Sequence, residues 1–123
     1  MAAVLVTLAS AVGATAVSTS LVISQVYGGG GNSGATYTND FIELYNTGTV
    51  SVSLDTWSVQ YISAAPGAST TWQVTDLTGS IAPGAHYLVG EAAGTGTPQA
   101  LPTPDATGTI NMSSTSGTVA LDT

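Results

Sequence analysis

Short runs of alternating apolar and polar residues, separated by clusters of glycine, proline, asparagine and serine, make up this 123-residue chain from residue 21 onward. In residues 40–46, Ile42 and Leu44 point to one face of an extended chain and the residues between them to the other. This period of two is typical of strands with one buried face. After residue 20 the sequence has no helical period with capping residues. Several short strands with turn signals between them predict a single all-β domain, a β-sandwich.

Strands are expected where the alternation is clearest, and loops where glycine and proline gather. The candidate strands are residues 21–27, 40–46, 50–54, 57–61, 72–74, 86–89, 110–112 and 119–121. Residues 92–108, rich in Gly, Pro and Thr, are predicted to form one long loop. In the first strand, strict alternation places two sets of side chains on opposite faces: Leu21, Ile23 and Gln25 on one, and Val22, Ser24 and Val26 on the other.

The charged residues are few and all acidic. Seven Asp and Glu residues, with no Lys or Arg, give the chain a net charge of −7. Without cationic side chains the chain cannot neutralise phosphates, which excludes electrostatic binding of nucleic acid, and it cannot form a basic membrane-binding patch. The lack of cysteine in the sequence excludes disulfides, thiolate metal sites and cysteine nucleophiles. An apolar content of 43 % is that of a folded domain rather than a disordered chain.

Residues 1–20 form an apolar N-terminal segment ahead of the predicted sandwich, which spans residues 21–123. The segment has the small-x-small pattern of a signal-peptide cleavage site at residues 14–16 but lacks the positively charged leader. It is too short and too rich in Ser, Thr and Gly for a membrane span. Two interpretations stay open: a secretion signal, or a retained donor strand that packs on a sheet through Val4, Val6, Leu8, Val12 and Val17. Both imply an extracellular or cell-surface location.

Three motifs carry a resemblance to a known family: Phe-Ile-Glu-Leu-Tyr-Asn at residues 41–46, Val-Ser-Leu-Asp-Thr-Trp-Ser-Val at 52–59, and Leu-Thr-Gly-Ser-Ile-Ala-Pro-Gly-Ala-His-Tyr-Leu-Val at 77–89. They resemble the lamin tail domain, in particular its exported bacterial branch. The resemblance implies an immunoglobulin-like β-sandwich whose core includes Ile42, Leu44, Leu54, Trp57, Val59, Tyr87 and Val89. It also implies a closing strand after residues 117–121, which this sequence lacks, so we expect one open edge. In bacteria such domains often accompany secreted nucleases, phosphatases or surface proteins as the non-catalytic part.

Few residues point to catalysis or to a cofactor. His86 is the single histidine, and no neighbouring motif supplies a nucleophile and an orienting acid, so we expect a surface histidine. The glycine-rich run at residues 28–34 lacks the Lys-Ser/Thr ending of a phosphate loop. Asp40 and Glu43 lie three apart on a predicted strand, so they project to opposite faces and do not form a pair. Glu43 is expected to fix a loop or a strand end. Neither enzyme activity nor a cofactor is predicted.

Two weaker patterns concern calcium and glycans. Asp76, Glu91 and Asp105 lie in predicted loops, and calcium takes loop carboxylates as ligands, but the Asp-x-Asp-x-Asp spacing of a calcium loop is missing. The default interpretation of these three acids is a solvated surface. Asn111, followed by Met and Ser, matches the pattern for N-glycosylation, which is short and often accidental.

Two functions stay open for a domain of this kind. One is a structural protein that self-assembles into an extracellular filament, each subunit donating residues 1–20 to its neighbour. The other is a binding or targeting module of a larger secreted enzyme such as a nuclease. A binding role predicts exposed Tyr37, Tyr61 or Trp72, with Trp57, Tyr61 and Trp72 as a carbohydrate-stacking platform; the alternative for Trp57 is the core. A filament role places Tyr37, Tyr61 and Trp72 at contacts between subunits.

Overall fold

The computed structural model of the chain describes residues 20–64, 67 and 71–123, and these residues form nine strands and no helix. In chain order the strands are β1 (Leu21–Tyr27), β2 (Asn39–Asn46), β3 (Val52–Ser53), β4 (Ser58–Ile62), β5 (Gln73–Asp76), β6 (Ser80–Ile81), β7 (His86–Ala93), β8 (Ala106–Thr107) and β9 (Thr118–Asp122). Tight turns between them use glycine at positive φ, as at Gly79 and Gly84. The predicted all-β class is confirmed.

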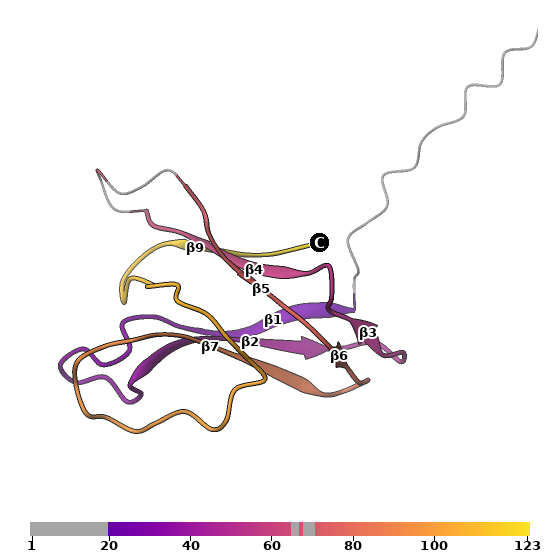
Figure 1. The fold of residues 1–123 in the computed structure, drawn as a ribbon, viewed down its shortest axis with the longest axis horizontal. Helices are drawn as coiled ribbons and strands as arrows, with labels where there is room; N and C mark the ends of the chain where they lie inside the picture. Colours follow the sequence, from indigo (N-terminus) through magenta and orange to yellow (C-terminus); the bar gives the residue numbers. More distant parts are fainter. Residues whose placement is uncertain (1–19, 65–66, 68–70) are drawn as a thin grey trace, which may run out of the picture.

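The strands pack in two layers (Figure 1). One sheet has the order β1-β2-β7-β8 and the other has the order β5-β4-β9, while the short β3-β6 ladder lies at one end. Paired strands are antiparallel except for β7 and β8, which are parallel. Inward side chains from the two sheets share one core, as in an immunoglobulin-like sandwich.

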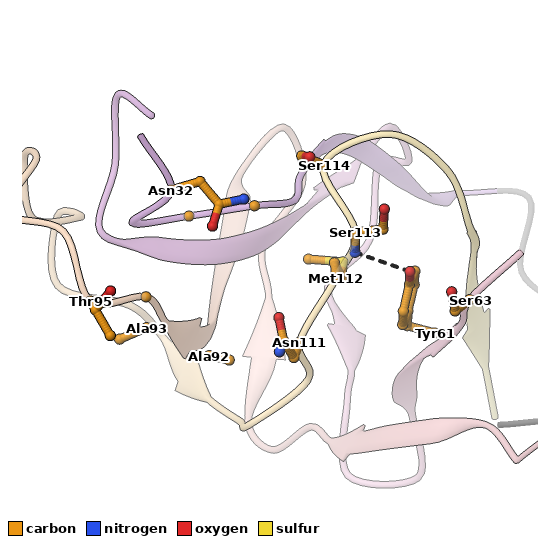
Figure 2. A pocket seen from close by; sticks show the side chains of 13 residues that line it. Asn32, Tyr61, Ser63, Ala92, Ala93, Thr95, Asn111, Met112, Ser113 and Ser114 are labelled. Atoms are coloured by element: carbon orange, nitrogen blue, oxygen red, sulfur yellow. Dashed lines mark hydrogen bonds between the residues drawn. The ribbon is translucent and has the colours of Figure 1, made fainter. Parts of the chain in front are cut away.

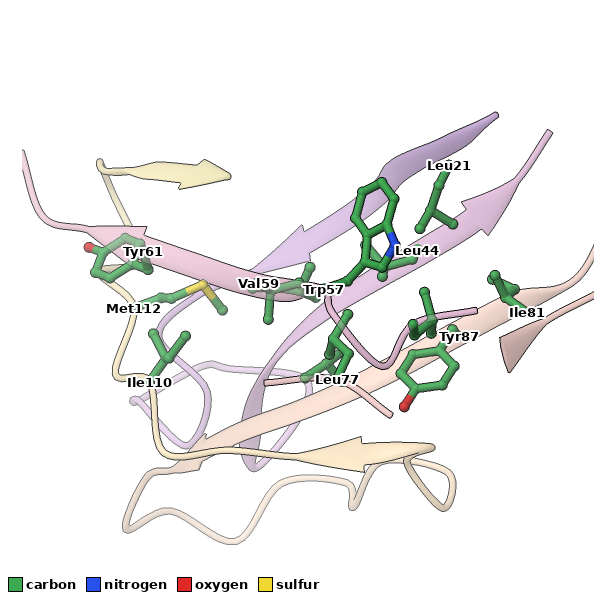
Figure 3. Close-up of a cluster of buried hydrophobic side chains, with 13 residues drawn as sticks. Leu21, Leu44, Trp57, Val59, Tyr61, Leu77, Ile81, Tyr87, Ile110 and Met112 are labelled. Carbon is green, nitrogen blue, oxygen red and sulfur yellow. The ribbon is translucent and has the colours of Figure 1, made fainter. Parts of the chain in front are cut away.

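The core between the sheets contains all seven residues that the family resemblance implied for it: Ile42, Leu44, Leu54, Trp57, Val59, Tyr87 and Val89. Figure 3 shows this cluster. Five of them are completely buried, and Trp57 and Tyr87 are 8 % and 6 % exposed. Trp57 is therefore a core residue and not part of a sugar-stacking platform. The remaining core side chains come from strand ends and loops: Leu21, Tyr61, Leu77, Ile81, Ile110 and Met112. Tyr87 donates its hydroxyl proton to the carbonyl of Thr78 at 2.9 Å, which satisfies the polar end of a buried ring.

The alternation predicted for β1 fails after Ile23 because the strand contains a β-bulge. Ile23 pairs with Leu44, but the next ladder partner of β2, Glu43, pairs with Gln25, so Ser24 is the extra residue. An extra residue shifts every later side chain to the other face. Val26 therefore pairs with Ile42 and shares the inner face with Ile23, contrary to the prediction.

Residues 106–117 differ most from the sequence prediction. Residues 110–112 are an extended segment outside any ladder, although Ile110 and Met112 are 2 % and 3 % exposed. Side-chain carboxylates, rather than a neighbouring strand, bind the backbone N–H groups of Ile110 and Met112.

Two further predictions differ from the structure. The predicted loop of residues 92–108 contains β8, which pairs with β7. The strand predicted at residues 50–54 is reduced to β3, and Val50 is 72 % exposed.

Candidate functional site

Two edge strands, β1 and β9, bound the same side of the sandwich. Among the described residues, each pairs with one neighbour, β2 or β4, and the two strands contact each other across the layers. We call the space between their free edges the open seam. A free edge presents unpaired backbone N–H and C=O groups, which can bind another extended chain. The open seam is therefore a candidate site for strand addition.

Apolar side chains on the inner faces are left partly uncovered at the open seam. Val26 is 48 % exposed, although its ladder partner Ile42 is completely buried. Val119 is only partly buried, although its partner Tyr61 is 3 % exposed. In a closed sandwich these inward positions are covered by the opposite sheet or by a further strand. The core is thus open to solvent along this side.

A cavity of about 230 Å³ opens at the open seam, where β1 ends and β9 begins. Its apolar walls are Val26, Tyr61, Met112 and Val119, and residues 113–117 form its rim. The Tyr61 hydroxyl accepts a hydrogen bond from the backbone N–H of Ser113 at 3.0 Å and donates to the carbonyl of Ser116 at 3.2 Å. The Tyr61 ring thereby fixes the position of the rim.

A second hollow, the loop-end pocket, lies at one end of the sandwich (Figure 2). Its volume is about 620 Å³. It is lined by residues 29, 30 and 32, by the end of β7 and the loop that follows it (residues 92–95), by residues 111–114, and by Tyr61 and Ser63. The side chains that face it include Asn32, Ser63, Thr95, Asn111 and Ser114, and none of the described residues that line it is charged. Gly29, Gly30 and Asn32 of the glycine-rich run form one wall of this pocket.

Two buried carboxylates hold the segment that leads to β9. Asp40 and Glu91 are each 2 % exposed. Asp40 accepts hydrogen bonds from the backbone N–H groups of Gly30 and Met112, both at 2.6 Å. Glu91 Oε2 accepts from the N–H of Ile110 at 2.9 Å. These bonds replace the ladder partners that residues 110–112 do not have.

The Glu91 carboxyl has one oxygen without a partner. Glu91 Oε1 and the hydroxyl of Thr75 are both buried, and neither makes a hydrogen bond in the described structure. Burial raises the pKa of Glu91 above its ordinary value of 4.5. The hydrogen bond from the backbone of Ile110 and the nearby Thr75 side chain oppose the shift, and the Asp40 carboxylate adds a smaller increase. Glu91 is therefore a structural acid that resists ionisation.

The three acids considered for calcium are not brought together. Glu91 lies in the interior, Asp105 accepts the backbone N–H of Leu88 at 2.8 Å, and Asp76 is exposed on β5. Among the residues that the structure describes, no three His, Asp or Glu side chains form a metal-binding group. The interpretation of Glu91 as a solvated surface acid is wrong. The sequence does not show that β7 extends as far as Glu91, where the side chain is buried.

His86 lies on the outer face of the first sheet and contacts Glu43. Its Nδ1 is 3.0 Å from Glu43 Oε1, and its side chain is 56 % exposed. Ser24 donates to the same Glu43 oxygen at 2.6 Å. In a Ser-His-acid triad the histidine lies between the hydroxyl and the carboxylate, whereas here the carboxylate lies between the other two. This trio therefore positions strands and does not activate a nucleophile.

The aromatic residues do not form one platform. Tyr61 lies in the core and Trp72 is 39 % exposed, next to β5. Tyr37 packs against Tyr27 and Phe41, with ring centroids 5.6 and 5.8 Å apart. Among the three aromatics expected to be exposed for binding, Trp72 alone has that exposure.

Two sequence predictions concern peripheral residues. Asn111 is exposed at the mouth of the loop-end pocket, and its backbone N–H donates to Gln73 Oε1 at 3.3 Å. The predicted assembly residues Val4, Val6, Leu8, Val12 and Val17 lie outside the described residues. No helix in the described part of the chain is long and apolar enough to cross a membrane.

The two-layer architecture and the open seam define an immunoglobulin-like sandwich domain. The family model of the lamin tail domain matches residues 14–123, and the chain belongs to that family. The family consists of binding and structural domains of immunoglobulin type. Neither a curated protein nor a solved structure matches the chain. The family match begins within the apolar N-terminal segment, so Val17 lies inside the matched range and Val4, Val6, Leu8 and Val12 precede it.

Proposed function

We propose that this chain is a non-catalytic, exported structural protein that assembles into an extracellular filament. Each subunit donates its apolar N-terminal segment, residues 1–20, as an additional strand to the sandwich of the next subunit. In strand addition, main-chain hydrogen bonds supply affinity and alternate side chains supply specificity. Because the donor and the acceptor are different parts of the molecule, the contact is head-to-tail and propagates into a filament unless the rotation closes a ring.

The observation that carries this proposal is the exposure of inward-facing apolar side chains between two free strand edges. Val26 is the clearest case, at 48 % exposed on the inner face of β1. Soluble proteins commonly protect such edges with lysine or proline. This chain has no lysine, and its proline residues lie outside β1 and β9. Unprotected edges favour a protein whose edges are occupied in its working state.

The composition of the N-terminal segment supports the same function. Residues 1–19 contain no charged side chain, and Val4, Val6 and Leu8 alternate with other residues at the period of a strand. An uncharged strand can be buried between sheets without the cost of desolvating a charge. The low charge content of the whole chain, 6 %, suits extensive contacts between subunits in the same way.

Electron microscopy of the full chain beside a variant that lacks residues 1–19 tests the proposal. We expect filaments from the full chain and single particles from the shortened chain, because the shortened chain keeps the acceptor and loses the donor. Mixing the two should give shorter filaments, because the shortened chain ends growth. Single particles from both proteins, or filaments from both, would contradict donation of this segment.

The second candidate function is a binding or targeting module of a larger secreted enzyme. The loop-end pocket favours it, since loops at one end of an immunoglobulin-like sandwich are a common place for ligands and about 620 Å³ is within the range of small-molecule sites. Its uncharged lining suits a neutral polar ligand such as a carbohydrate. A panel of neutral oligosaccharides in thermal-shift measurements tests this function, with Asn111→Leu as the variant that should lose the response.

A further inference from the structure

Val26 and Val74 are two valines of nearly equal exposure on different faces of the molecule. Val26 is 48 % exposed and pairs with the buried Ile42, so it lies on an inner face. Val74 is 51 % exposed and pairs with Gln60, on the outer face of the second sheet. An exposed valine on an outer face is ordinary. An exposed valine on an inner face, beside a cavity, marks missing cover over the core.

The open seam has the shape and chemistry of an acceptor for one apolar strand. Four apolar side chains point inward at its edges: Ile23, Val26, Val119 and Leu121. Val26 is exposed, and the other three are half-buried. The cavity between Val26, Tyr61, Met112 and Val119 is large enough, at about 230 Å³, to receive apolar side chains. None of the described residues that line this cavity is charged. A strand with small or medium apolar residues at alternate positions complements this surface.

The direction of β1 indicates which copy supplies that strand. The carbonyl of Ser20 accepts hydrogen bonds from the backbone N–H and the hydroxyl of Thr47, at 2.7 and 2.9 Å. Ser20 is thereby fixed at the start of β1, whereas Val26 and the cavity are at its other end. Six residues of strand separate them, roughly 20 Å. The chain therefore enters β1 from the end of the seam that is remote from the cavity. A donor from the same copy must reverse direction and run back along β1, whereas a donor from a second copy can enter directly at the cavity end.

We infer that the open seam between β1 and β9 is the acceptor for the N-terminal segment of a second copy of this chain. The inward side chains of the donor are Val4, Val6, Leu8 and Val12, and one of them fills the cavity beside Val26 and Tyr61. This inference rests on the proposed function and adds to it the acceptor surface and the face of the donor. In an extended donor the even-numbered face carries Val4, Val6, Leu8 and Val12, while the odd-numbered face carries Thr7, Ala9 and Ala11 together with one large apolar residue, Leu5.

Disulfide trapping in the full chain tests the inference, because the natural sequence has no cysteine to interfere. Val26→Cys is combined with one donor substitution at a time: Val4→Cys, Val6→Cys, Leu8→Cys or Val12→Cys. Matched controls combine Val26→Cys with Thr7→Cys, Ala9→Cys or Ala11→Cys. A disulfide needs Cα atoms within about 7 Å and suitable Cβ directions, so only a donor residue facing Val26 will be trapped.

We expect at least one even-numbered donor to give a ladder of covalent oligomers on a non-reducing gel, and the odd-numbered controls to stay monomeric. A fast-migrating monomer with an internal disulfide would overturn the assignment to a second copy. Filaments that form normally but trap no even-numbered pair would overturn the seam as acceptor and leave the filament proposal standing. Absence of filaments from the natural chain, or loss of residues 1–16 from the secreted protein in its intact mass, would overturn both.

A charge at the seam supplies an independent readout. Val26→Asp should block assembly, because it places a carboxylate where an apolar strand must bind, whereas Val74→Asp should assemble as the natural chain does. The two valines are similarly exposed, but Val26 lies on the inner face, so Val26→Asp carries the greater risk for folding. Thermal unfolding of both variants checks that each sandwich is folded. Equal filament yields from two folded variants would overturn the inference.

Discussion

Glu91 is an acid in the interior of a chain that has no Lys or Arg to pair with it. One of its oxygens binds Ile110, and the other has no partner within the described structure. Burial and the neighbouring Asp40 raise its pKa. A group whose folded pKa exceeds its unfolded pKa binds more protons in the folded state, so its contribution to stability is complete below the unfolded pKa and is lost as the pH rises through the folded pKa. Glu91 thus favours the folded state in acid, opposite to most carboxylates.

The substitution Glu91→Gln isolates this effect, since the amide resembles the protonated acid and does not ionise. We expect the variant to match the natural chain near pH 4 and to be more stable by roughly 1–2 kcal/mol near pH 8, because only the natural chain then carries a buried charge. Urea unfolding at several pH values, followed by fluorescence of the buried Trp57, measures the difference. A difference that does not change with pH would contradict the assignment.

Asp40→Asn is the matched contrast at the neighbouring acid. Both oxygens of Asp40 accept backbone N–H groups, from Gly30 and Met112. In the variant an amide NH₂ replaces one oxygen and points at a backbone N–H, so two hydrogen-bond donors face each other. The variant should therefore lose about 2–3 kcal/mol of unfolding free energy near pH 7. The two isosteric substitutions therefore have opposite signs.

At the scale of the elements, the strands with one buried face were predictable from sequence and the segment before β9 was not. β1, β2 and β7 were located by alternation, because each has one face toward the core. Residues 110–112 owe their place to carboxylates 19 and 72 positions away, and no local pattern reports such partners. The bulge at Ser24 was missed for the same reason, since register is set by the neighbouring strand. The open seam was expected from the family resemblance, but its cavity depends on long-range packing.

Tyr61 links the segment before β9 to the second sheet. Its hydroxyl makes two hydrogen bonds, with the backbone of Ser113 and of Ser116, that fix the rim of the cavity. Tyr61→Phe keeps the buried ring and removes only these bonds, so we expect a loss of about 1–2 kcal/mol. Amide hydrogen exchange should accelerate most at residues 113–117 and little in β2. Tyr87→Phe, which removes a hydroxyl bonded to Thr78 elsewhere in the core, is the control, and uniform acceleration throughout the sandwich in Tyr61→Phe would argue against a local role.

At the scale of the whole molecule, the net charge of −7 opposes every contact between copies, while no charged side chain is among the described residues that line the cavity at the seam. Repulsion between subunits acts across tens of ångströms at low salt and is screened beyond about 8 Å at physiological ionic strength. The apolar and main-chain contacts of strand addition are not weakened by this screening. Salt should therefore accelerate assembly, in contrast to a contact held together by ion pairs, which salt weakens.

This prediction can be separated from general salt effects by changing the charge instead of the solvent. Thr49→Lys with Val50→Lys changes the net charge from −7 to −5 at exposed positions of the turn between β2 and β3, outside the seam. We expect this variant to assemble faster than the natural chain at about 10 mM salt and at the same rate at about 150 mM, because the screened solution already removes the repulsion. Thr49→Gln with Val50→Gln controls for the loss of the original side chains, and light scattering follows the rates. If the lysine variant assembled faster at both salt concentrations, the lysines would be making a new contact. If added salt slowed assembly of the natural chain, an uncharged interface would be excluded.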